Sequence, residues 1–218
     1  MKLLDALDKM QNQTINDIPF ETLFKDISID LINKGRIGQL LEILLGLQNG
    51  NSLTDFEDGE LKTNKAKVNG LPIETMFITQ LATQVDDLLN NIGFEESRLY
   101  QKINRLIYIP VVKMGEPTDW FFKKPVYFEM IKGDAFYHQL EEDFHTIIEQ
   151  MKNHIKTDGQ LHTSSGKYIQ IRTKDSKPYR PIYSHVYNAP ISNKNFAFYF
   201  KKSFMTDLLK KSVDYPDI

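Results

Sequence analysis

The sequence predicts a mixed α/β domain, with a central mixed sheet and flanking helices. Three observations carry this prediction. The apolar, β-branched run RLIYIPVVKM (residues 105–114) is typical of a buried strand. Residues 133–156 repeat apolar side chains at helical spacing. Residues 168–174 and 196–201 alternate between two kinds of side chain, which predicts strands with two unlike faces.

The composition predicts one water-soluble domain that spans residues 1–218. No stretch rich in Gly, Ser or Pro is long enough to form a linker. No apolar run approaches the roughly 18 residues of a membrane span, and the first residues lack a signal-peptide core, so we expect a cytoplasmic protein without membrane contact. The chain has no cysteine and its histidines lack ligand spacing, so any metal must be bound by oxygen atoms.

The basic residues are distributed unevenly. The net charge is −2, yet residues 167–211 carry ten basic side chains against Asp175 and Asp207 only. The ten are Lys167, Arg172, Lys174, Lys177, Arg180, Lys194, Lys201, Lys202, Lys210 and Lys211. Such clustering is typical of a phosphate-binding surface, and the alternative is a solvated basic face.

Candidate catalytic groups gather in residues 55–63, DFEDGELKT. Glu60 and Lys62 are two residues apart, so on a strand they leave the same face. Asp55 precedes the turn signal Asp58-Gly59, which can return its carboxylate beside Glu60. Carboxylates hold Mg²⁺ and an ammonium stabilises developing charge, a set suited to phosphodiester cleavage. The alternative is a polar hairpin that faces solvent.

A fourth candidate precedes this segment. Residues 37–45 carry an apolar stripe at helical spacing, and Gly38, Glu42 and Gly46 share a second line on the same helix. The two glycines leave room for a ligand or another backbone next to Glu42. The alternative is a glutamate at the rim of an ordinary core helix.

The segments KGRIGQLLEILLG (34–46), DFEDGELKT (55–63) and PIETMF (72–77) resemble the MutH/Sau3AI family of DNA endonucleases, within the PD-(D/E)XK superfamily. The resemblance implies a restriction-endonuclease-like fold with a DNA-binding cleft. It implies an active site of Glu42, Asp55, Glu60 and Lys62, with Asp55 and Glu60 as Mg²⁺ ligands. The interval between Asp55 and Glu60 is shorter than in the mismatch-repair members, which leaves Glu57 and Asp58 open as alternatives to Asp55.

Three further segments extend the resemblance. KINRLIYIPV (102–111) is similar to the segment in which the family carries an additional active-site lysine, here Lys102. KYIQIRTK (167–174) and FAFYFKKSFMTDLL (196–209) resemble the base-reading strand and the C-terminal strand and helix. By this likeness Arg172 and Lys174 read the target, and Tyr199 senses adenine or its methylation. We place Lys201 with Tyr199 on an outward, DNA-contacting face.

The remaining elements follow from local patterns. We expect helices at 3–10, 20–32, 81–89 and 95–103, and a strand at 73–79 antiparallel to the Glu60 strand, so that the metal motif lies on a hairpin. Residues 120–130 predict an edge strand broken at Pro125. The helix at 133–156 should bury Phe136, Leu140, Phe144, Ile147, Ile148 and Met151. Its opposite face should be acidic through Glu141, Glu142, Asp143 and Glu149.

Together these features predict a Mg²⁺-dependent, sequence-specific endonuclease of double-stranded DNA. We expect a catalytic arm over residues 1–110 and a recognition arm over 111–218. The main hypothesis is a type II restriction enzyme, at the GATC-like site that the resemblance implies, which acts as a transient homodimer assembled on DNA. The first alternative is a mismatch-repair endonuclease that nicks unmethylated strands and is activated by a MutL-type partner. The second is a catalytically silent DNA-binding module.

Overall fold

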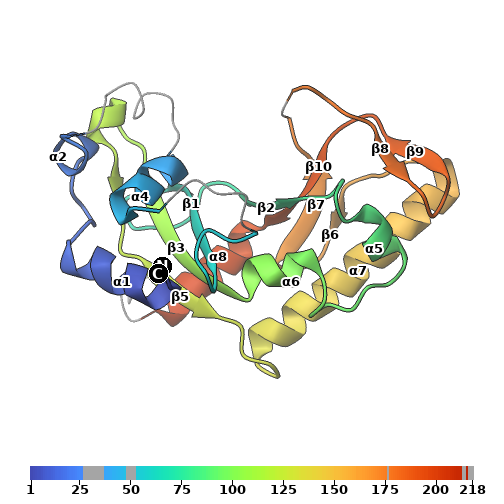
Figure 1. Cartoon of the computed structure of the whole chain (residues 1–218), viewed down its shortest axis with the longest axis horizontal. Coiled ribbons are helices and arrows are strands. Elements are labelled where there is room, and N and C mark those ends of the chain that lie inside the picture. The colour runs from blue at the N-terminus through green and yellow to red at the C-terminus, as the bar shows by residue number, and fades with distance from the viewer. Residues whose placement is uncertain (27–36, 48–52, 176, 213–214, 216–218) are drawn as a thin grey trace. The chain divides into compact units, whose positions relative to one another are not determined.

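The protein is described by a computed structural model, which covers residues 1–26, 37–47, 53–175, 177–212 and 215 (Figure 1). The chain divides into two compact units. The first comprises Met1–Glu74, Asn104–Glu129 and Met205–Ile218, and the second comprises Thr75–Ile103 and Met130–Phe204. Neither unit is a continuous piece of sequence, and the division of function into arms at about residue 110 stays a prediction.

The first unit is built on a four-stranded mixed sheet. Its strands are β1 (Glu60–Ala66), β3 (Arg105–Val112), β4 (Phe121–Phe122) and β5 (Val126–Glu129). β1 runs parallel to β3 along its whole length, whereas β4 and β5 pair antiparallel with β3. All residues of β3 after Arg105 are buried, as the apolar run predicts, and Ile107, Ile109 and Val111 pack in one core cluster with residues of α1 and α4.

Helices cover this sheet and share its core. They are α1 (Leu3–Asn12), α2 (Phe20–Leu23), α4 (Ile37–Leu45) and the 3-10 turn η1 (Pro117–Asp119). One core cluster joins Leu3, Ala6 and Met10 of α1 to buried residues of α4 and the sheet. The helix predicted for residues 20–32 is present at Phe20–Leu23, and residues 27–36 lie outside the described part of the chain.

The second unit holds an antiparallel sheet in the order β2-β10-β7-β6 and a separate β8-β9 pair. The strands are β2 (Met76–Gln80), β6 (Ser164–Ser165), β7 (Ile169–Thr173), β8 (Ile182–Ser184), β9 (Ala189–Ser192) and β10 (Phe196–Phe200). The helices are α5 (Val85–Leu89), α6 (Arg98–Ile103) and α7 (Ala135–Asp158). The last helix, α8 (Lys202–Lys211), begins after β10 in the second unit and continues from Met205 into the first unit.

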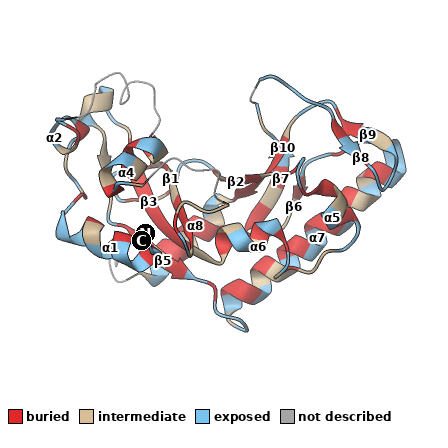
Figure 2. Cartoon of the chain, viewed as in Figure 1, coloured by how far each residue is buried: buried red, intermediate tan, exposed pale blue. Residues whose placement is uncertain are grey.

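Helix α7 confirms the predicted inner stripe and corrects the predicted outer face. Asp134 caps its first turn by accepting a hydrogen bond from the Tyr137 amide at 2.7 Å. All six stripe residues are buried, and Figure 2 shows buried and exposed residues alternating along the helix. Asp143, however, is only 2% exposed, because backbone amides of the segment before β7 surround its carboxylate. No described helix is long and apolar enough to cross a bilayer.

The predicted hairpin between the Glu60 strand and residues 73–79 is wrong. After the turn that follows β1, the two segments share a bridge between Ala66 and Pro72 and a hydrogen bond from the Ile73 amide to the Lys65 carbonyl. Glu74 also accepts hydrogen bonds from the Asn64 side chain and the Lys65 amide, but no regular ladder forms between these two described segments. β2 pairs with β10 in the second unit instead. β1 pairs in parallel with β3 over seven residues. The predicted break at Pro125 is confirmed, because it separates β4 from β5.

Candidate functional site

The candidate active site begins at the first residue of β1. Because side chains alternate along a strand, Glu60 and Lys62 leave the same face. The Lys62 ammonium donates a hydrogen bond of 2.6 Å to Glu60 Oε1. The Glu60 side chain is 3% exposed and the Lys62 side chain 11%, so the ion pair is largely shielded from water. The predicted shared face is present, and it places an ammonium against a buried carboxylate.

A tight turn returns Asp55 to the start of β1, as the Asp58-Gly59 signal predicts. Phe56 and Gly59 form an antiparallel bridge, with the Phe56 amide 2.9 Å from the Gly59 carbonyl. Asp55 Oδ2 accepts a hydrogen bond of 2.9 Å from the Leu61 amide. That amide belongs to the residue between Glu60 and Lys62, so the Asp55 carboxylate lies at the end of the strand that carries both.

The alternatives to Asp55 have other contacts in the structure. Glu57 forms a 2.8 Å ion pair with the amino group of Met1. Asp58 accepts hydrogen bonds from the Leu3 amide at 2.7 Å and from Arg105 at 3.2 Å. Both carboxylates are therefore held against the N-terminal helix region, which favours Asp55 as the carboxylate of the site.

Glu42 lies in the middle of α4 and is half-buried. Burial raises its pKa above the ordinary value, and the negative charges of Asp55 and Glu60 raise it further. Three like charges therefore share one region of the first unit, with Lys62 as the cation bonded to Glu60. Such an arrangement binds a cation favourably, because a cation relieves the repulsion among the carboxylates.

The donor set fits a hard divalent metal in its chemistry. Carboxylate oxygens are the ligands that Mg²⁺ and Ca²⁺ prefer, and Glu60 and Asp55 supply carboxylates from β1 and from the turn before it. Among the described residues, no three His, Cys, Asp or Glu side chains already form a metal cage. The site therefore presents two neighbouring carboxylates with a third group nearby, and substrate oxygens and water would have to complete the coordination of a metal.

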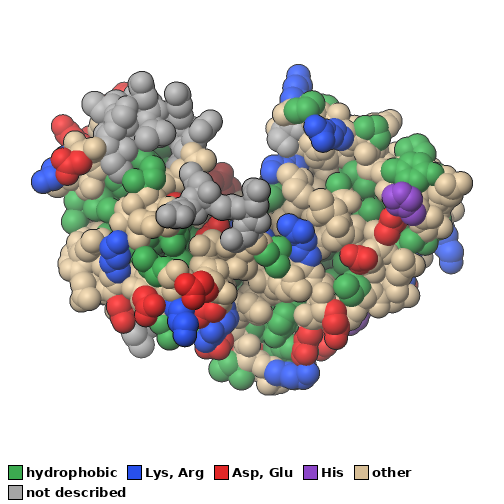
Figure 3. Space-filling model, viewed as in Figure 1, with side chains coloured by type: hydrophobic (Ala, Val, Ile, Leu, Met, Phe, Trp, Pro, Cys, Tyr) green, Lys and Arg blue, Asp and Glu red, His purple; other side chains and the backbone are tan. Residues whose placement is uncertain are grey.

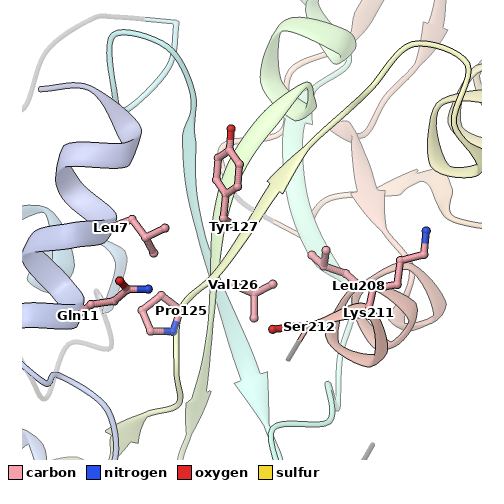
Figure 4. Close-up of a pocket in the computed structure, with 8 residues that line it drawn as sticks. All are labelled: Leu7, Gln11, Pro125, Val126, Tyr127, Leu208, Lys211 and Ser212. Carbon is pink, nitrogen blue, oxygen red and sulfur yellow. The ribbon is translucent and has the colours of Figure 1, made fainter. Parts of the chain in front are cut away.

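A pocket of about 520 Å³ adjoins this site. Asp55 lines it together with residues from the same turn and from the end of α4: Met1, Gly46, Leu47, Thr54, Phe56 and Glu57. A second pocket, of about 320 Å³, lies between α1, β5 and α8 and is lined by Leu7, Gln11, Pro125, Val126, Tyr127, Leu208, Lys211 and Ser212 (Figure 4). None of the predicted catalytic residues lines this second pocket, so the first is the one related to the chemistry.

In the second unit, the predicted DNA-contacting residues surround an aromatic pair. Tyr199 on β10 and Phe77 on β2 meet edge to face at 5.8 Å. The Arg172 guanidinium lies 4.5 Å from the centre of the Tyr199 ring, and Lys174 Nζ lies 4.1 Å from that of Phe77. Arg172 also donates a 3.0 Å hydrogen bond to Thr75 Oγ1. The structure thus brings Arg172, Lys174 and Tyr199 into one cluster.

Tyr199 is less exposed than its predicted outward position implies. It is 8% exposed, because β10 lies between β2 and β7 and side chains of both neighbours cover its ring. Burial raises the pKa of the Tyr199 hydroxyl and lowers the pKa of Lys174. Arg172 is exposed, so of the cluster it is the side chain most accessible to a ligand.

Two further predicted residues, Lys201 and Lys102, also belong to the second unit. Lys201 Nζ donates hydrogen bonds to the Gly166 carbonyl at 2.8 Å and to Ser165 Oγ at 3.3 Å, so its ammonium holds the turn between β6 and β7. Lys102 is in the last turn of α6, in the second unit, and its place in the active site stays a prediction. Figure 3 shows several Lys and Arg side chains over the loop near β7 and β10.

Phe77 and Thr75 were not singled out from the sequence, although both contact the predicted DNA-contacting residues. Thr75 and Phe77 are two residues apart in the alternating run before Gln80. This spacing already indicated that the two side chains share one face. Their partners on β7 and β10 are about a hundred residues away, and only the strand order β2-β10-β7 connects them.

The fold and the site define a nuclease of the PD-(D/E)XK type: a strand carries Glu-x-Lys, a turn returns an aspartate to it, and helices flank a mixed sheet.

Comparison of the sequence with known proteins leads to the same class. The chain is 30% identical to the DNA mismatch repair protein MutH of Buchnera aphidicola over 203 residues, covering 88% of each chain. It is 29% identical to MutH of Escherichia coli (82% and 78% covered) and 24% identical to MutH of Actinobacillus pleuropneumoniae (99% and 95% covered). No family model matches the chain. The chain belongs to the MutH family of DNA endonucleases.

Proposed function

We propose that this protein is a mismatch-repair endonuclease that nicks the unmethylated strand of duplex DNA at a GATC-like site, with Mg²⁺ as cofactor. The observation that carries the proposal is the convergence of Glu42, Asp55, Glu60 and Lys62 in the first unit. The relatives are named DNA mismatch repair proteins, which supports this alternative over the restriction-enzyme hypothesis.

Each group of the site has a role in phosphodiester hydrolysis. Asp55 and Glu60 would hold the metal, which when bound polarises the phosphate and acidifies a water. Lys62, hydrogen-bonded to Glu60, orients the attacking water and stabilises the charge that develops on the phosphate. Glu42, whose pKa is raised, accepts a proton more readily than an ordinary glutamate. Lys102 would contact the phosphate.

Recognition is assigned to the cluster of the second unit. A guanidinium can donate two parallel hydrogen bonds to guanine O6 and N7, and Arg172 is exposed and oriented by Thr75 and Tyr199. Lys174 would contact a base or a phosphate. Tyr199 would lie against the adenine whose methylation is sensed, and Lys201 would act through the turn that it holds.

A MutL-type partner belongs to the proposal because the function of the named relatives is mismatch repair. One active site cuts one strand, so a single chain bound to its site produces a nick. A restriction enzyme must instead assemble two copies on a palindromic site to cut both strands. A transient homodimer on DNA is therefore expected of the second candidate function, the restriction enzyme. Cooperative double-strand cleavage would support it.

The test uses duplexes with one GATC site that are unmethylated, methylated on one strand or methylated on both. With Mg²⁺ and purified protein, we expect cleavage of unmethylated strands only, stimulated by a MutL-type protein with ATP. Glu60→Gln serves as the inactive control. Equal cleavage of methylated and unmethylated strands, or no cleavage of any duplex with the stimulating protein present, would contradict the proposal.

A further inference from the structure

Helix α1 holds the end of the helix that carries Glu42. Lys9, in the last turn of α1, donates a hydrogen bond of 3.0 Å from Nζ to the carbonyl of Leu45. Leu45 is the last residue of α4, and Gly46 then leaves the helix with a φ of +73°. Carbonyl groups at a helix C-terminus lack partners and carry partial negative charge, so an ammonium there is stabilising. Lys9 thereby fixes α4 three residues beyond Glu42.

The other end of α1 holds the turn that carries Asp55. Asp58 Oδ1 accepts a 2.7 Å hydrogen bond from the amide of Leu3, the first residue of the helix. Its other oxygen accepts one from Arg105, the first residue of β3, at 3.2 Å. A carboxylate at a helix N-terminus is stabilising for the same reason that a cation is at its C-terminus. Asp58 therefore ties the turn to α1 and to the sheet.

The packing at this end of α1 is close. A Cβ on Gly59 would lie 2.3 Å from Leu3 Cδ1 and 2.8 Å from the Arg105 carbonyl oxygen. Leu3 is 1% exposed and belongs to the core cluster of the first unit. Only a glycine fits at this position, so the turn between Asp55 and Glu60 and the start of α1 are fitted to one another.

We infer that α1 is a positioning element of the active site: Lys9 and Asp58 hold the Glu42 helix and the Asp55–Glu60 turn at a fixed separation. The inference rests on the proposed function, since it concerns the same carboxylates. Neither residue is assigned to substrate or metal, so both are positioning residues. The constraint matters because Glu42, Asp55 and Glu60 repel one another, and α1 opposes their separation through contacts at both ends.

The first test replaces the ammonium without touching the carboxylates. In Lys9→Met we expect kcat for nicking to fall by about tenfold or more, since small misplacements of catalytic groups are costly. We expect Kd for duplex DNA in Ca²⁺ to stay within about twofold, because none of the proposed DNA-contacting residues lies on α1 or α4. Lys9→Arg, which retains the cation, should recover most of the rate. The exposed Lys67→Met is the matched control.

The second test measures the arrangement in metal-free protein by hydrogen exchange. Lys9→Met should raise amide exchange in residues 37–47, and Asp58→Ala should raise it in residues 53–61, while α7 stays unchanged. Asp8→Asn, on the exposed side of α1, is the control for Asp58→Ala. In the double variant the losses in kcat should be less than multiplicative, because both changes release the same arrangement.

The inference is overturned if both variants keep a wild-type kcat, or if kcat and Tm fall while Kd rises, as in general destabilisation. Unchanged exchange in both segments overturns it as well. If the wild-type protein cleaves no DNA, the proposed function has failed, and the exchange experiment alone decides. Raised exchange limited to the two segments then supports α1 as their common anchor.

Discussion

Glu60 and Lys62 show how strongly two residues of one strand can depend on each other. Their ion pair is nearly inaccessible to water, and truncating either partner leaves the other charged group in a site with little solvent. The same closeness gives Lys62 its chemical role, because its ammonium is held beside a carboxylate that is assigned to the metal.

We therefore predict that Glu60→Ala and Lys62→Ala each reduce nicking by about 100-fold or more, the loss typical of removing one preorganised charge. DNA binding in Ca²⁺, measured by fluorescence anisotropy, should change little, because these groups act on metal and water. Lys65→Ala, three residues further along β1, is the control and should cleave normally. Substantial cleavage by either variant would disprove the site assignment.

Glu42 gives a prediction with opposite signs for stability and activity. Its pKa is raised in the folded protein, so ionisation opposes folding as the pH rises through that pKa. Glu42→Gln should therefore raise the free energy of unfolding in metal-free buffer at neutral pH by up to about 1 kcal/mol, which is measured as a higher Tm. This gain in stability should vanish at acidic pH. Nicking should fall. Calorimetry across pH checks the sign, and destabilisation at neutral pH would contradict it.

Arg172 and Lys210 should separate base reading from phosphate attraction. Arg172→Ala should cost about 1–3 kcal/mol of discrimination at one guanine. Lys210→Ala, an exposed change on α8, should weaken binding to all sequences and reduce the salt dependence. Competition binding with target and random duplexes at several salt concentrations distinguishes them. Equal losses on both duplexes for Arg172→Ala would make Arg172 a phosphate contact.

At the scale of elements, the strand that carries Arg172 depends on a buried carboxylate of α7. Asp143 accepts hydrogen bonds from the amides of Lys167, Tyr168 and Ile169 at 2.8, 2.5 and 3.0 Å. A Cβ on Gly166 would lie within 2.4 Å of this carboxylate, so the backbone approaches it closely. The long helix thus fixes the start of β7, and with it the register that places Arg172 opposite Ala197 of β10.

We predict that Asp143→Ala destabilises the protein by about 2–5 kcal/mol, because two buried amide donors and one partly buried donor lose their acceptor. Chemical denaturation monitored by circular dichroism measures the change. The neighbouring Glu142→Ala, on the exposed side of the same helix, should alter stability by less than about 0.5 kcal/mol. Equal effects of the two changes would show that Asp143 does not hold β7.

At the scale of the whole molecule, chemistry and recognition are assigned to different compact units. Glu42, Asp55, Glu60 and Lys62 lie in the first, and Arg172, Lys174 and Tyr199 lie in the second. Each unit draws on separate stretches of sequence, so neither can be cut out as one continuous fragment. Membership of a DNA endonuclease family, together with the intact set Glu42, Asp55, Glu60 and Lys62, argues against the catalytically silent DNA-binding alternative.

The number of active sites per bound protein predicts the product from supercoiled plasmid. A nicking enzyme should accumulate open circles at a rate proportional to protein concentration, accelerated by a MutL-type protein. A restriction enzyme should give linear DNA at a rate that rises more than linearly. Gel analysis of unmethylated plasmid over a range of protein concentrations distinguishes the two, and efficient linearisation without a partner would favour restriction.

The sequence alone determined what depends on neighbours along the chain. Alternation placed Glu60 and Lys62 on one face, the Asp58-Gly59 signal returned Asp55 to β1, and the apolar stripe defined α7. The tertiary structure decided what depends on distant partners. It paired β1 with β3, buried Asp143, and gathered Phe77 with Arg172 and Tyr199. Periodicity reports which face of a strand or helix is apolar, whereas strand pairing depends on which distant segment supplies the hydrogen bonds.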